Sequence, residues 1–363
     1  MEQFVGLDVS QAETAICVVD AAGAVQWQGK CASTPEAISA TLKQKAPQAV
    51  RIALETGPLS AWHWRALSKL GLPVVCIDAR HAKAALAMQV NKTDANDAFG
   101  LAQIVRTGWY REVRIKSEQS HRTRGLLAAR SKLVDMRKDV SNQLRGLLKV
   151  FGHVIKPAGG QSFETQARTL AEGDPVLSTT SEVLLATRHS LAEQIARLDK
   201  LLLTQARQDP TCRRLMSVPG VGAITAVAFT ATIDDPTRFR HSSSVGAYLG
   251  LTPRRYQSGT IDVAGHISKT GDCLLRSYLF EAATTLLTRV QRWSTLKAWA
   301  CGWPSASDRR RRGWRWPDNS RSCSTACGPT APSSVGLPRP PCSGQRTQVP
   351  LPGGRDRPCR DEA

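Results

Sequence analysis

The alternation of apolar and polar residues predicts a layered α/β arrangement in the first third of the chain. Five short apolar segments bounded by turn residues predict strands, at residues 3–9, 13–20, 24–32, 49–54 and 73–77. Segments with helical spacing predict helices at 35–46 and 59–70 and further helical segments within 79–106. Thr34 followed by Pro35 is typical of a helix start, because threonine can cap the helix and proline fits its first turn.

The order of these elements predicts the fold class. Three strands come first, and the fourth and fifth strands then alternate with helices. An antiparallel, hairpin-linked trio that continues into parallel strands is the arrangement of a ribonuclease H-like α/β domain. We therefore expect a single sheet with helices packed on it in the N-terminal part.

Two later segments have the spacing of amphipathic helices. Apolar residues recur every three or four positions from Leu133 to Phe151 and again from Leu191 to Leu202. Proline and glycine residues at 157–160 and 173–175 interrupt the chain between them. The pattern fits a long antiparallel or intermolecular coiled-coil pair, and it fits equally two helices that pack on their own domain.

A glycine-rich turn lies between two apolar runs within 215–232. Pro219, Gly220, Val221 and Gly222 form this turn, as in a helix-hairpin-helix. In such a motif the glycines let the backbone approach a phosphate, and the N–H groups that open the second helix bind it. The motif holds duplex DNA without reading its sequence. A plain glycine turn between packed helices explains the same residues.

Composition adds a strong positive charge to this pattern. The chain has 363 residues, with Lys+Arg 49 against Asp+Glu 30 and a formal net charge of +19. Its length favours two or more units over a single core. The surplus of positive charge predicts a polyanionic partner, of which nucleic acid is the first candidate.

Targeting signals and cysteines indicate the compartment. The chain begins without a basic secretory leader, and its apolar runs fall short of the ~20 residues that a membrane span needs. Cysteines up to residue 300 are widely scattered, which predicts reduced, structural thiols. We expect a cytosolic protein without a membrane partner.

Residues 301–363 differ from the rest in composition. They contain ten of the chain's 20 prolines, eleven arginines, no lysine, and only four residues among Leu, Ile, Val and Phe. So little apolar area predicts disorder. One interpretation is a basic tail that binds phosphates. The interpretation we favour is translation out of frame, because GC-rich coding DNA gives such a mixture when it is misread.

Four acidic residues lie where this α/β order would bring them together. Asp8 ends the first strand, Glu55 follows the fourth, and Asp94 and Asp97 share one face if their segment is helical. Clustered carboxylates repel one another, so their natural partner is a hard divalent cation, and two Mg²⁺ ions suit phosphodiester chemistry. Taken singly, each acid is also explained by a turn, a helix cap or a surface position. Asp78 is a competing strand-end acid that ranks below these four.

A serine surrounded by cationic residues lies within 244–270. Ser258 precedes Gly259, which makes the predicted loop permissive. Residues that could attract and orient a phosphate flank it, at Arg254, Arg255, His266, Lys269 and Arg276. Such a serine can attack phosphorus and form a covalent intermediate. On the sequence alone, a polar turn residue beside arginines is the plainer explanation.

The motifs GLDVS, ALETGP, KTDANDA, SVPGVG and GLTPRRYQSG occur in that order. As a set they closely resemble the insertion-sequence one-hundred-and-ten family of transposases, from about residue 3 to about residue 298. The resemblance implies a RuvC-like domain whose DEDD set binds Mg²⁺, and this set comprises Asp8, Glu55, Asp94 and Asp97. It also implies that Ser258 is the nucleophile.

The resemblance implies a domain organisation and partners as well. We expect a RuvC-like DEDD domain at 1–112, a helical coiled-coil linker at 113–206, a mainly α transposase domain with the helix-hairpin-helix and serine loop at 207–300, and the tail at 301–363. Relatives recombine double-stranded DNA under a structured noncoding guide RNA. They work as dimers paired into tetramers, in which one subunit's carboxylates act with another's serine. The implied location is the nucleoid in a bacterial cytoplasm. Residues expected to contact nucleic acid are Gly220, Gly222, Arg254, Arg255, Lys269 and Arg276.

Family members continue with a helix-rich segment where this chain has its unusual tail. Two alternatives to a transposase stay open. One is a structure-specific nuclease or resolvase that uses activated water, with Ser258 incidental. The other is a nucleic-acid-binding remnant that lost its activity when the reading frame was disrupted.

Overall fold

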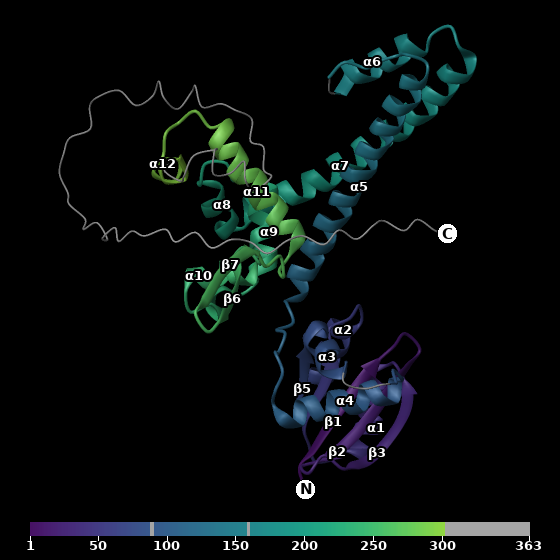
Figure 1. Ribbon diagram of the computed structural model, residues 1–363. Helices are drawn as coiled ribbons and strands as arrows, with labels where there is room; N and C mark the ends of the chain where they lie inside the picture. The colour runs from purple at the N-terminus through teal and green to yellow at the C-terminus, as the bar shows by residue number, and fades with distance from the viewer. Residues whose placement is uncertain (88–90, 158–159, 302–363) are drawn as a thin grey trace, which may run out of the picture. The chain divides into compact units, whose positions relative to one another are not determined.

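In the computed structural model, which describes residues 1–87, 91–157 and 160–301, the N-terminal strands form one five-stranded sheet (Figure 1). The strands are β1 (Gln3–Val9), β2 (Glu13–Asp20), β3 (Val25–Ala32), β4 (Ala49–Glu55) and β5 (Val74–Ile77). Their order is β3-β2-β1-β4-β5, antiparallel from β3 to β1 and parallel from β1 to β5. This order confirms the predicted ribonuclease H-like domain.

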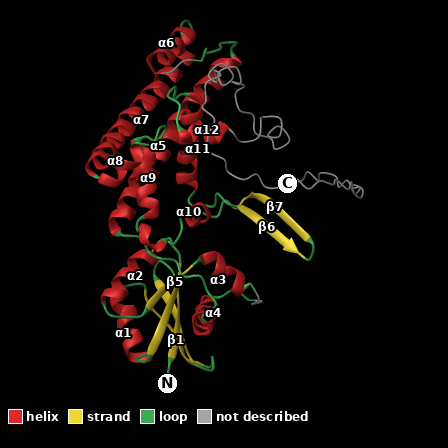
Figure 2. Ribbon diagram, turned by 90° about the vertical axis from the view of Figure 1, so that its left-hand side faces the viewer, coloured by secondary structure: helices red, strands yellow, loops and turns green. Residues whose placement is uncertain are grey.

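Helices cover both faces of this sheet (Figure 2). They are α1 (Pro35–Lys45), α2 (Ser60–Lys69), α3 (Ala79–Leu86) and α4 (Asp94–Thr107). α1 and α2 pack on one face against Leu7 and Leu54, and α3 and α4 pack on the other against Ala15 and Ala53. As predicted, Thr34 caps α1. Each face of the sheet thus has its own apolar core.

Two long helices lie side by side after this domain (Figure 1). The helices of this part are α5 (Glu118–Val150), α6 (Gly160–Ala171) and α7 (Pro175–Gln208), with α6 at the end where the long helices are joined. Gln205 donates a hydrogen bond to Thr123, and Arg188 donates one to Ser141. Residue numbers therefore rise along α5 while they fall along α7, so the pair is antiparallel.

A third part is built around a central apolar helix. Its elements are α8 (Pro210–Met216), α9 (Ala223–Ile233), a short 3₁₀ helix (Pro236–Arg238), α10 (Ser242–Tyr248), β6 (Pro253–Ser258), β7 (Ile261–Ile267), α11 (Cys273–Thr288) and α12 (Thr295–Cys301). α9 contacts α5, α7, α8 and α11. Ala226, Val227 and Ala228 of α9 are buried, which makes this helix the core of the part.

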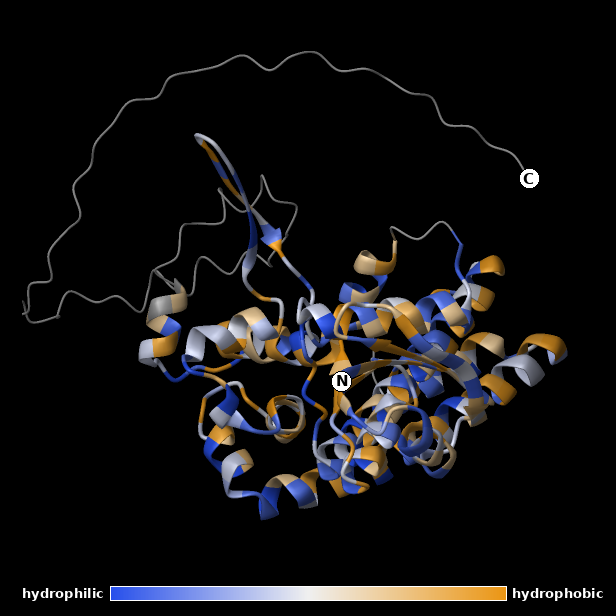
Figure 3. Ribbon diagram, turned by 90° about the horizontal axis from the view of Figure 1, so that it is seen from below, coloured by the Kyte–Doolittle hydropathy of each residue, from blue (hydrophilic) through white to orange (hydrophobic). Residues whose placement is uncertain are grey.

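β6 and β7 form an antiparallel hairpin where the sequence predicted a loop. Both strands are exposed along their whole length, and the hairpin projects from the helices (Figures 2 and 3). A strand that buries neither face needs no alternation of apolar and polar residues. β6 has no such alternation, whereas β7 carries Ile261, Val263 and Ile267 on one face, all of them exposed.

The five cysteines up to residue 300 are free thiols, as predicted. Cys17, Cys76 and Cys212 are buried. Burial raises the pKa of the Cys76 thiol to about 12, so this side chain is a packing group rather than a reactive thiolate.

The predicted disordered or misframed tail lies outside the described residues from 302 onward. Among the helices that are described, none combines the length and apolar content required to cross a bilayer.

Candidate active site

Asp8 and Glu55 lie side by side on two parallel strands. The register of β1 and β4 pairs Leu7 with Leu54, which places the two acids at the next position of each strand. Leu7 and Leu54 are buried with α1 and α2. Because successive side chains alternate between the faces of a sheet, Asp8 and Glu55 face the opposite side, toward α4.

α4 approaches β1 closely because Gly6 has no side chain. A Cβ atom on Gly6 would lie 2.0 Å from the carbonyl oxygen of Ala98. Gly6 and Asp8 share one face of β1, and Ala98 directly follows Asp97 in the chain. The close approach therefore carries the first turn of α4, with Asp94 and Asp97, toward Asp8.

The charges of these acids act on one another. Burial raises the pKa of Asp8, and the carboxylates of Asp97 and Asp94 raise it further. Burial also raises the pKa of Glu55, and Asp8 and Asp97 add to this effect. Asp94 is exposed, and its hydrogen bond and charge interaction with Lys30, at 2.8 Å, lower its pKa. The fold therefore gathers all four predicted acids near the carboxyl ends of β1 and β4.

A hard divalent cation fits this set of side chains. Carboxylate oxygens are the ligands that Mg²⁺ prefers, and a cation would relieve the repulsion between Asp8 and Glu55. Within the residues that the structure describes, no three His, Cys, Asp or Glu side chains are already arranged to hold a metal ion. The carboxylates must turn toward one another, and Asp94 must leave Lys30, before all four can be ligands.

Asp78, the competing acid, has a local role. It caps α3 by accepting a hydrogen bond from the Arg80 N–H, and its carboxylate pairs with the Arg80 side chain at 2.7 Å. The hydrogen bond from the Arg80 side chain lowers the pKa of Asp78. Its charge is therefore already balanced within α3.

Ser258 lies at the tip of the projecting hairpin. It ends β6 and pairs with Ile261, so the turn consists of two residues, of which Gly259 has φ +56°. This is the left-handed region that glycine adopts readily. In the described structure, no hydrogen bond or ion pair joins Ser258 to the four acids. The serine is presented to solvent, apart from the acidic cluster.

The base of the hairpin is closely packed. A Cβ atom on Gly271 would lie 2.3 Å from the carbonyl oxygen of Tyr248, and one on Gly250 would lie 2.5 Å from the Thr270 nitrogen. The Lys269 N–H donates a hydrogen bond to the Gly250 carbonyl oxygen. The direction of the hairpin is thus fixed at its base, although its strands are exposed.

The predicted phosphate-binding cations differ in how free they are. Three have partners within the protein: Arg254 donates to the Ser268 carbonyl oxygen, Arg255 pairs with Asp262, and Arg276 donates to the Leu249 carbonyl oxygen. The Arg255–Asp262 pair is largely exposed, so it is weak and a phosphate can compete with it. Lys269 is exposed, and its φ of 55° is unusual for a non-glycine residue.

The two glycines of the α8–α9 turn have different surroundings. Gly220 has φ +90°, and a Cβ atom there would lie 2.6 Å from the carbonyl oxygen of Ala282 in α11. Packing against α11 therefore requires this glycine. Gly222 precedes α9, whose N-terminus has no side-chain cap from the described residues, and none of their atoms lies within 4 Å of a Cβ atom at this position. Of the two, Gly222 leaves a helix N-terminus open to a phosphate.

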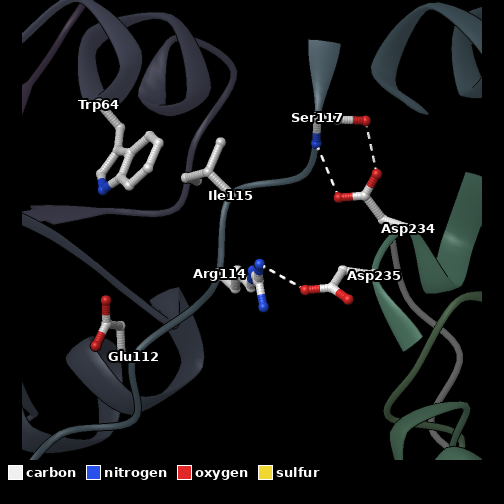
Figure 4. Close-up of a pocket in the computed structure, with 7 residues that line it drawn as sticks. All are labelled: Trp64, Glu112, Arg114, Ile115, Ser117, Asp234 and Asp235. Carbon is white, nitrogen blue, oxygen red and sulfur yellow. Dashed lines mark hydrogen bonds and ion pairs between the residues drawn. The ribbon is translucent and has the colours of Figure 1, made fainter. Parts of the chain in front are cut away.

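A polar junction at the start of α5 was missed by the sequence analysis. Asp234 accepts hydrogen bonds from the N–H and the hydroxyl of Ser117, at 2.9 Å and 2.6 Å (Figure 4), and from the Ser120 hydroxyl at 2.6 Å. Burial acts to raise the pKa of Asp234, but these hydrogen bonds and Lys116 together lower it. Ser117 and Asp234 are 117 positions apart, so no local pattern reveals their contact.

The same junction borders a cavity of about 750 Å³. The residues that line it are Trp64, Glu112, Arg114, Ile115, Ser117, Asp234 and Asp235 (Figure 4). Arg114 and Asp235 form an ion pair of 2.7 Å on its wall. Asp234 and Asp235 therefore hold the chain together here and are distinct from the four acids at the sheet.

Two family models match the chain. A DEDD transposase model of the IS110 type matches residues 5–152, and a model described as the transposase IS116/IS110/IS902 family matches residues 212–298. The first match contains all four acids of the cluster, and the second contains Ser258 and the α8–α9 turn.

Curated relatives are similar over most of the chain. The transposase for insertion sequence element IS1111A of Coxiella burnetii is 27% identical, and the alignment covers 82% of this chain and 81% of that protein. The probable family 20 transposase of Pseudomonas aeruginosa is 31% identical, over 63% of this chain and 69% of that protein. A Thermus thermophilus RuvC structure aligns with 31% of this chain and 99% of that chain, at 15% identity and a TM-score of 0.23. We base the fold assignment on the strand order instead.

Proposed function

The chain belongs to the IS116/IS110/IS902 family of transposases, and we propose that it breaks and rejoins double-stranded DNA with an acidic metal centre and a serine nucleophile. As a member of that family it is a DNA transposase. The finer mechanism is best supported by the gathering of four acids near the carboxyl ends of β1 and β4 in a ribonuclease H-like sheet. They are Asp8, Glu55, Asp94 and Asp97.

We assign residues 1–112 to a RuvC-like DEDD domain, 113–206 to a helical linker and 207–300 to the transposase domain. Two hydrophobic clusters lie on the faces of the N-terminal sheet, which supports the first boundary, and one lies at the α6 end of the long helices. The cluster around α9 also contains Leu127 of α5 and Leu202 of α7, so the helical linker and the transposase domain share one core.

We assign the four acids as ligands of Mg²⁺, with two ions in the complete site. When bound, the metal supplies Lewis-acid stabilisation of the charge on a reacting phosphate. The protein's contribution is to position the ligands. Asp8 and Glu55 are fixed by strand register, and Asp94 and Asp97 are fixed by a helix that Gly6 allows to lie directly on β1.

We assign Ser258 as the nucleophile. Its Oγ forms a bond to phosphorus while the bond from phosphorus to one deoxyribose oxygen breaks. The serine proton passes to solvent, and the leaving oxygen takes up a proton to become a hydroxyl. A deoxyribose hydroxyl then attacks the serine ester, which restores the phosphodiester and the free serine. The number of ester bonds is unchanged, so no external energy source is needed. Exposed Arg254, Arg255 and Lys269 are suited to orient the phosphate.

The partners follow from the same assignment. The net charge of +19 supports binding to polyanions, and we propose DNA as the substrate and a structured noncoding RNA as the guide. Gly220, Gly222 and Arg276 belong to the nucleic-acid-binding surface in this proposal. We further propose homodimers paired into tetramers, in which a projecting Ser258 hairpin meets the acids of another copy. The site of action is the nucleoid in the bacterial cytoplasm.

A second candidate function is a metal-dependent, structure-specific nuclease or resolvase. One observation favours it: Ser258 is exposed on its hairpin and has no hydrogen bond to any of the four acids in the described structure. In this function water is the nucleophile, and DNA is cut without becoming attached to the protein.

A covalent-adduct assay distinguishes the two functions. Wild-type protein with guide RNA, DNA and Mg²⁺ should give a protein–DNA adduct that survives denaturation. Ser258→Ala and Asp8→Asn should abolish it, and Ser277→Ala, an exposed serine on α11, should retain it. Cleavage without an adduct would support the nuclease. Binding without any cleavage until an in-frame C-terminus is restored would support an inactive remnant.

A further inference from the structure

Lys30 extends the row of charged residues across the sheet. The strand register places Asp8 opposite Ala15, and Ala15 opposite Lys30. Residues directly opposite each other on antiparallel strands project to the same face. Asp8, Ala15 and Lys30 therefore lie in a line on the face that α4 covers. Ala15 is small and buried, so the long Lys30 side chain can lie beside the acids.

β3 holds the first turn of α4 at two points. The Lys30 Nζ lies 2.8 Å from the Asp94 carboxylate and 3.9 Å from that of Glu13. Gln28, two residues earlier on the same face of β3, donates a hydrogen bond from its side-chain amide to the Ala95 carbonyl oxygen at 2.8 Å. One contact is charged and made to a side chain, and the other is neutral and made to the backbone.

These two contacts have different consequences for the acidic cluster. The Lys30 contact holds the Asp94 carboxylate at edge strand β3 and balances its charge there. A cation shared by all four acids requires Asp94 to exchange the ammonium group for that cation. The Gln28 contact can persist during this exchange, because it binds the backbone of α4 rather than the Asp94 side chain.

We propose that Lys30 is an internal counter-ion that competes with the divalent metal for Asp94. While the pair is intact, the cluster lacks one ligand, and metal binding must break the pair. Lys30 thereby weakens metal binding and acts as a positioning residue for Asp94. This inference rests on the proposed function, because it requires that the four acids bind a metal.

The exposure of the pair sets the size of the effect. The side chains of Lys30 and Asp94 are 49% and 59% exposed, so solvent screens their attraction. Exposed ion pairs of this kind change an equilibrium constant by about two- to five-fold. Removal of Lys30 should tighten metal binding by about that factor at low ionic strength, and the gain should shrink as salt is added.

Calorimetric titration of the full-length chain with Mn²⁺ tests the proposal. Lys30→Met and Lys30→Gln should each lower the dissociation constant about two- to five-fold, and Lys30→Arg, which keeps the charge, should restore the wild-type value. Lys43→Met is the matched control, because Lys43 is an exposed lysine on α1, at the opposite face of the sheet. Unchanged or weaker binding by Lys30→Met and Lys30→Gln would overturn the proposal.

A further measurement distinguishes failure of this proposal from failure of the proposed function on which it rests. Asp8→Asn should abolish the Mn²⁺ binding of the wild type. If the wild type binds no Mn²⁺, the metal centre itself is refuted. If the wild type binds Mn²⁺ through Asp8 and the Lys30 variants bind it equally well, only the role of Lys30 is refuted. Metal-free thermal unfolding of each variant confirms that the sheet domain is intact.

Discussion

Gly6→Ala tests the contact that places the acidic cluster. Gly6 lies in β1 beneath α4, and the added Cβ atom would lie 2.0 Å from the Ala98 carbonyl oxygen, where ordinary contact begins at 3.4 Å. The obstructing atom belongs to helix backbone, so no side chain can rotate away to make room. We expect α4 to shift from β1 and to carry Asp94 and Asp97 with it.

The structure sets two magnitudes for this change. Overpacking in a closed core lowers the free energy of unfolding by about 1–3 kcal/mol, which in a domain of this size lowers the melting temperature by several degrees. The displacement needed at Ala98 is about 1.4 Å, and a shift of about 1 Å in catalytic groups can cost a factor of about 100 in rate. As a free energy this rate loss is about 2.7 kcal/mol, within the range expected for the loss of stability, so both losses should be measurable.

Three measurements on one preparation test this change. Thermal unfolding measures stability, Mn²⁺ titration measures metal affinity, and the rate of adduct formation measures activity. Gly146→Ala is the matched control, because no atom in the described part of the chain lies within 4 Å of a Cβ atom at that position in α5. It should raise the stability by up to about 1 kcal/mol, since alanine favours a helix over glycine, and leave metal binding unchanged. Wild-type stability and wild-type metal affinity in Gly6→Ala would refute the packing of α4 on β1.

Three other predictions concern the hairpin, the junction and the basic surface. Gly271→Ala should disturb the hairpin base at Tyr248 and lower adduct formation by roughly ten-fold or more, and an equal loss of Mn²⁺ affinity would contradict this separation. Asp234→Asn should lower the free energy of unfolding by about 1–2 kcal/mol at neutral pH. Because the folded pKa of Asp234 is lowered, this stabilisation is present above the ordinary value of about 3.9 and is lost as pH falls through the folded value. Melting curves of wild type and variant should therefore converge in acid, and a constant difference would exclude this role. The logarithm of the DNA-binding constant should fall with the logarithm of salt by about 0.9 per phosphate neutralised. Lys269→Ala should reduce that slope by about one, and an unchanged slope would show that Lys269 does not contact a phosphate.

The sheet could be predicted from the sequence because β1, β2, β4 and β5 bury residues on both faces, and edge strand β3 has half-buried residues at alternate positions. Leu7 and Leu54 belong to one core, Ala15 and Ala53 to the other, and this two-sided burial produces short apolar runs. The strand order then implied that Asp8 and Glu55 would meet. Asp8 and Glu55 are neighbours because their strands pair in parallel, and this pairing follows from the order of the elements along the chain.

The remaining contacts could not be predicted because they depend on register and on distant partners. Lys30 reaches Asp94 because it pairs directly opposite Ala15. A shift of one residue in the register of β3 would turn Lys30 to the other face of the sheet. Asp234 meets Ser117 only after α5 and α9 have packed. The packing of Gly220 against α11, which by itself requires a glycine, involves a partner distant in the chain and is not visible in the local motif.

The exposed hairpin that carries Ser258 bears on how the protein assembles. A two-stranded ribbon that buries neither face is marginally stable in water, yet Gly250 and Gly271 fix its direction through backbone contacts at its base. Such a ribbon becomes well ordered when another surface covers it. In the proposed function that surface is DNA together with the acids of another copy. In that proposal the metal centre forms within one chain, whereas the serine reacts only after assembly, which would restrict DNA cleavage to the complete complex.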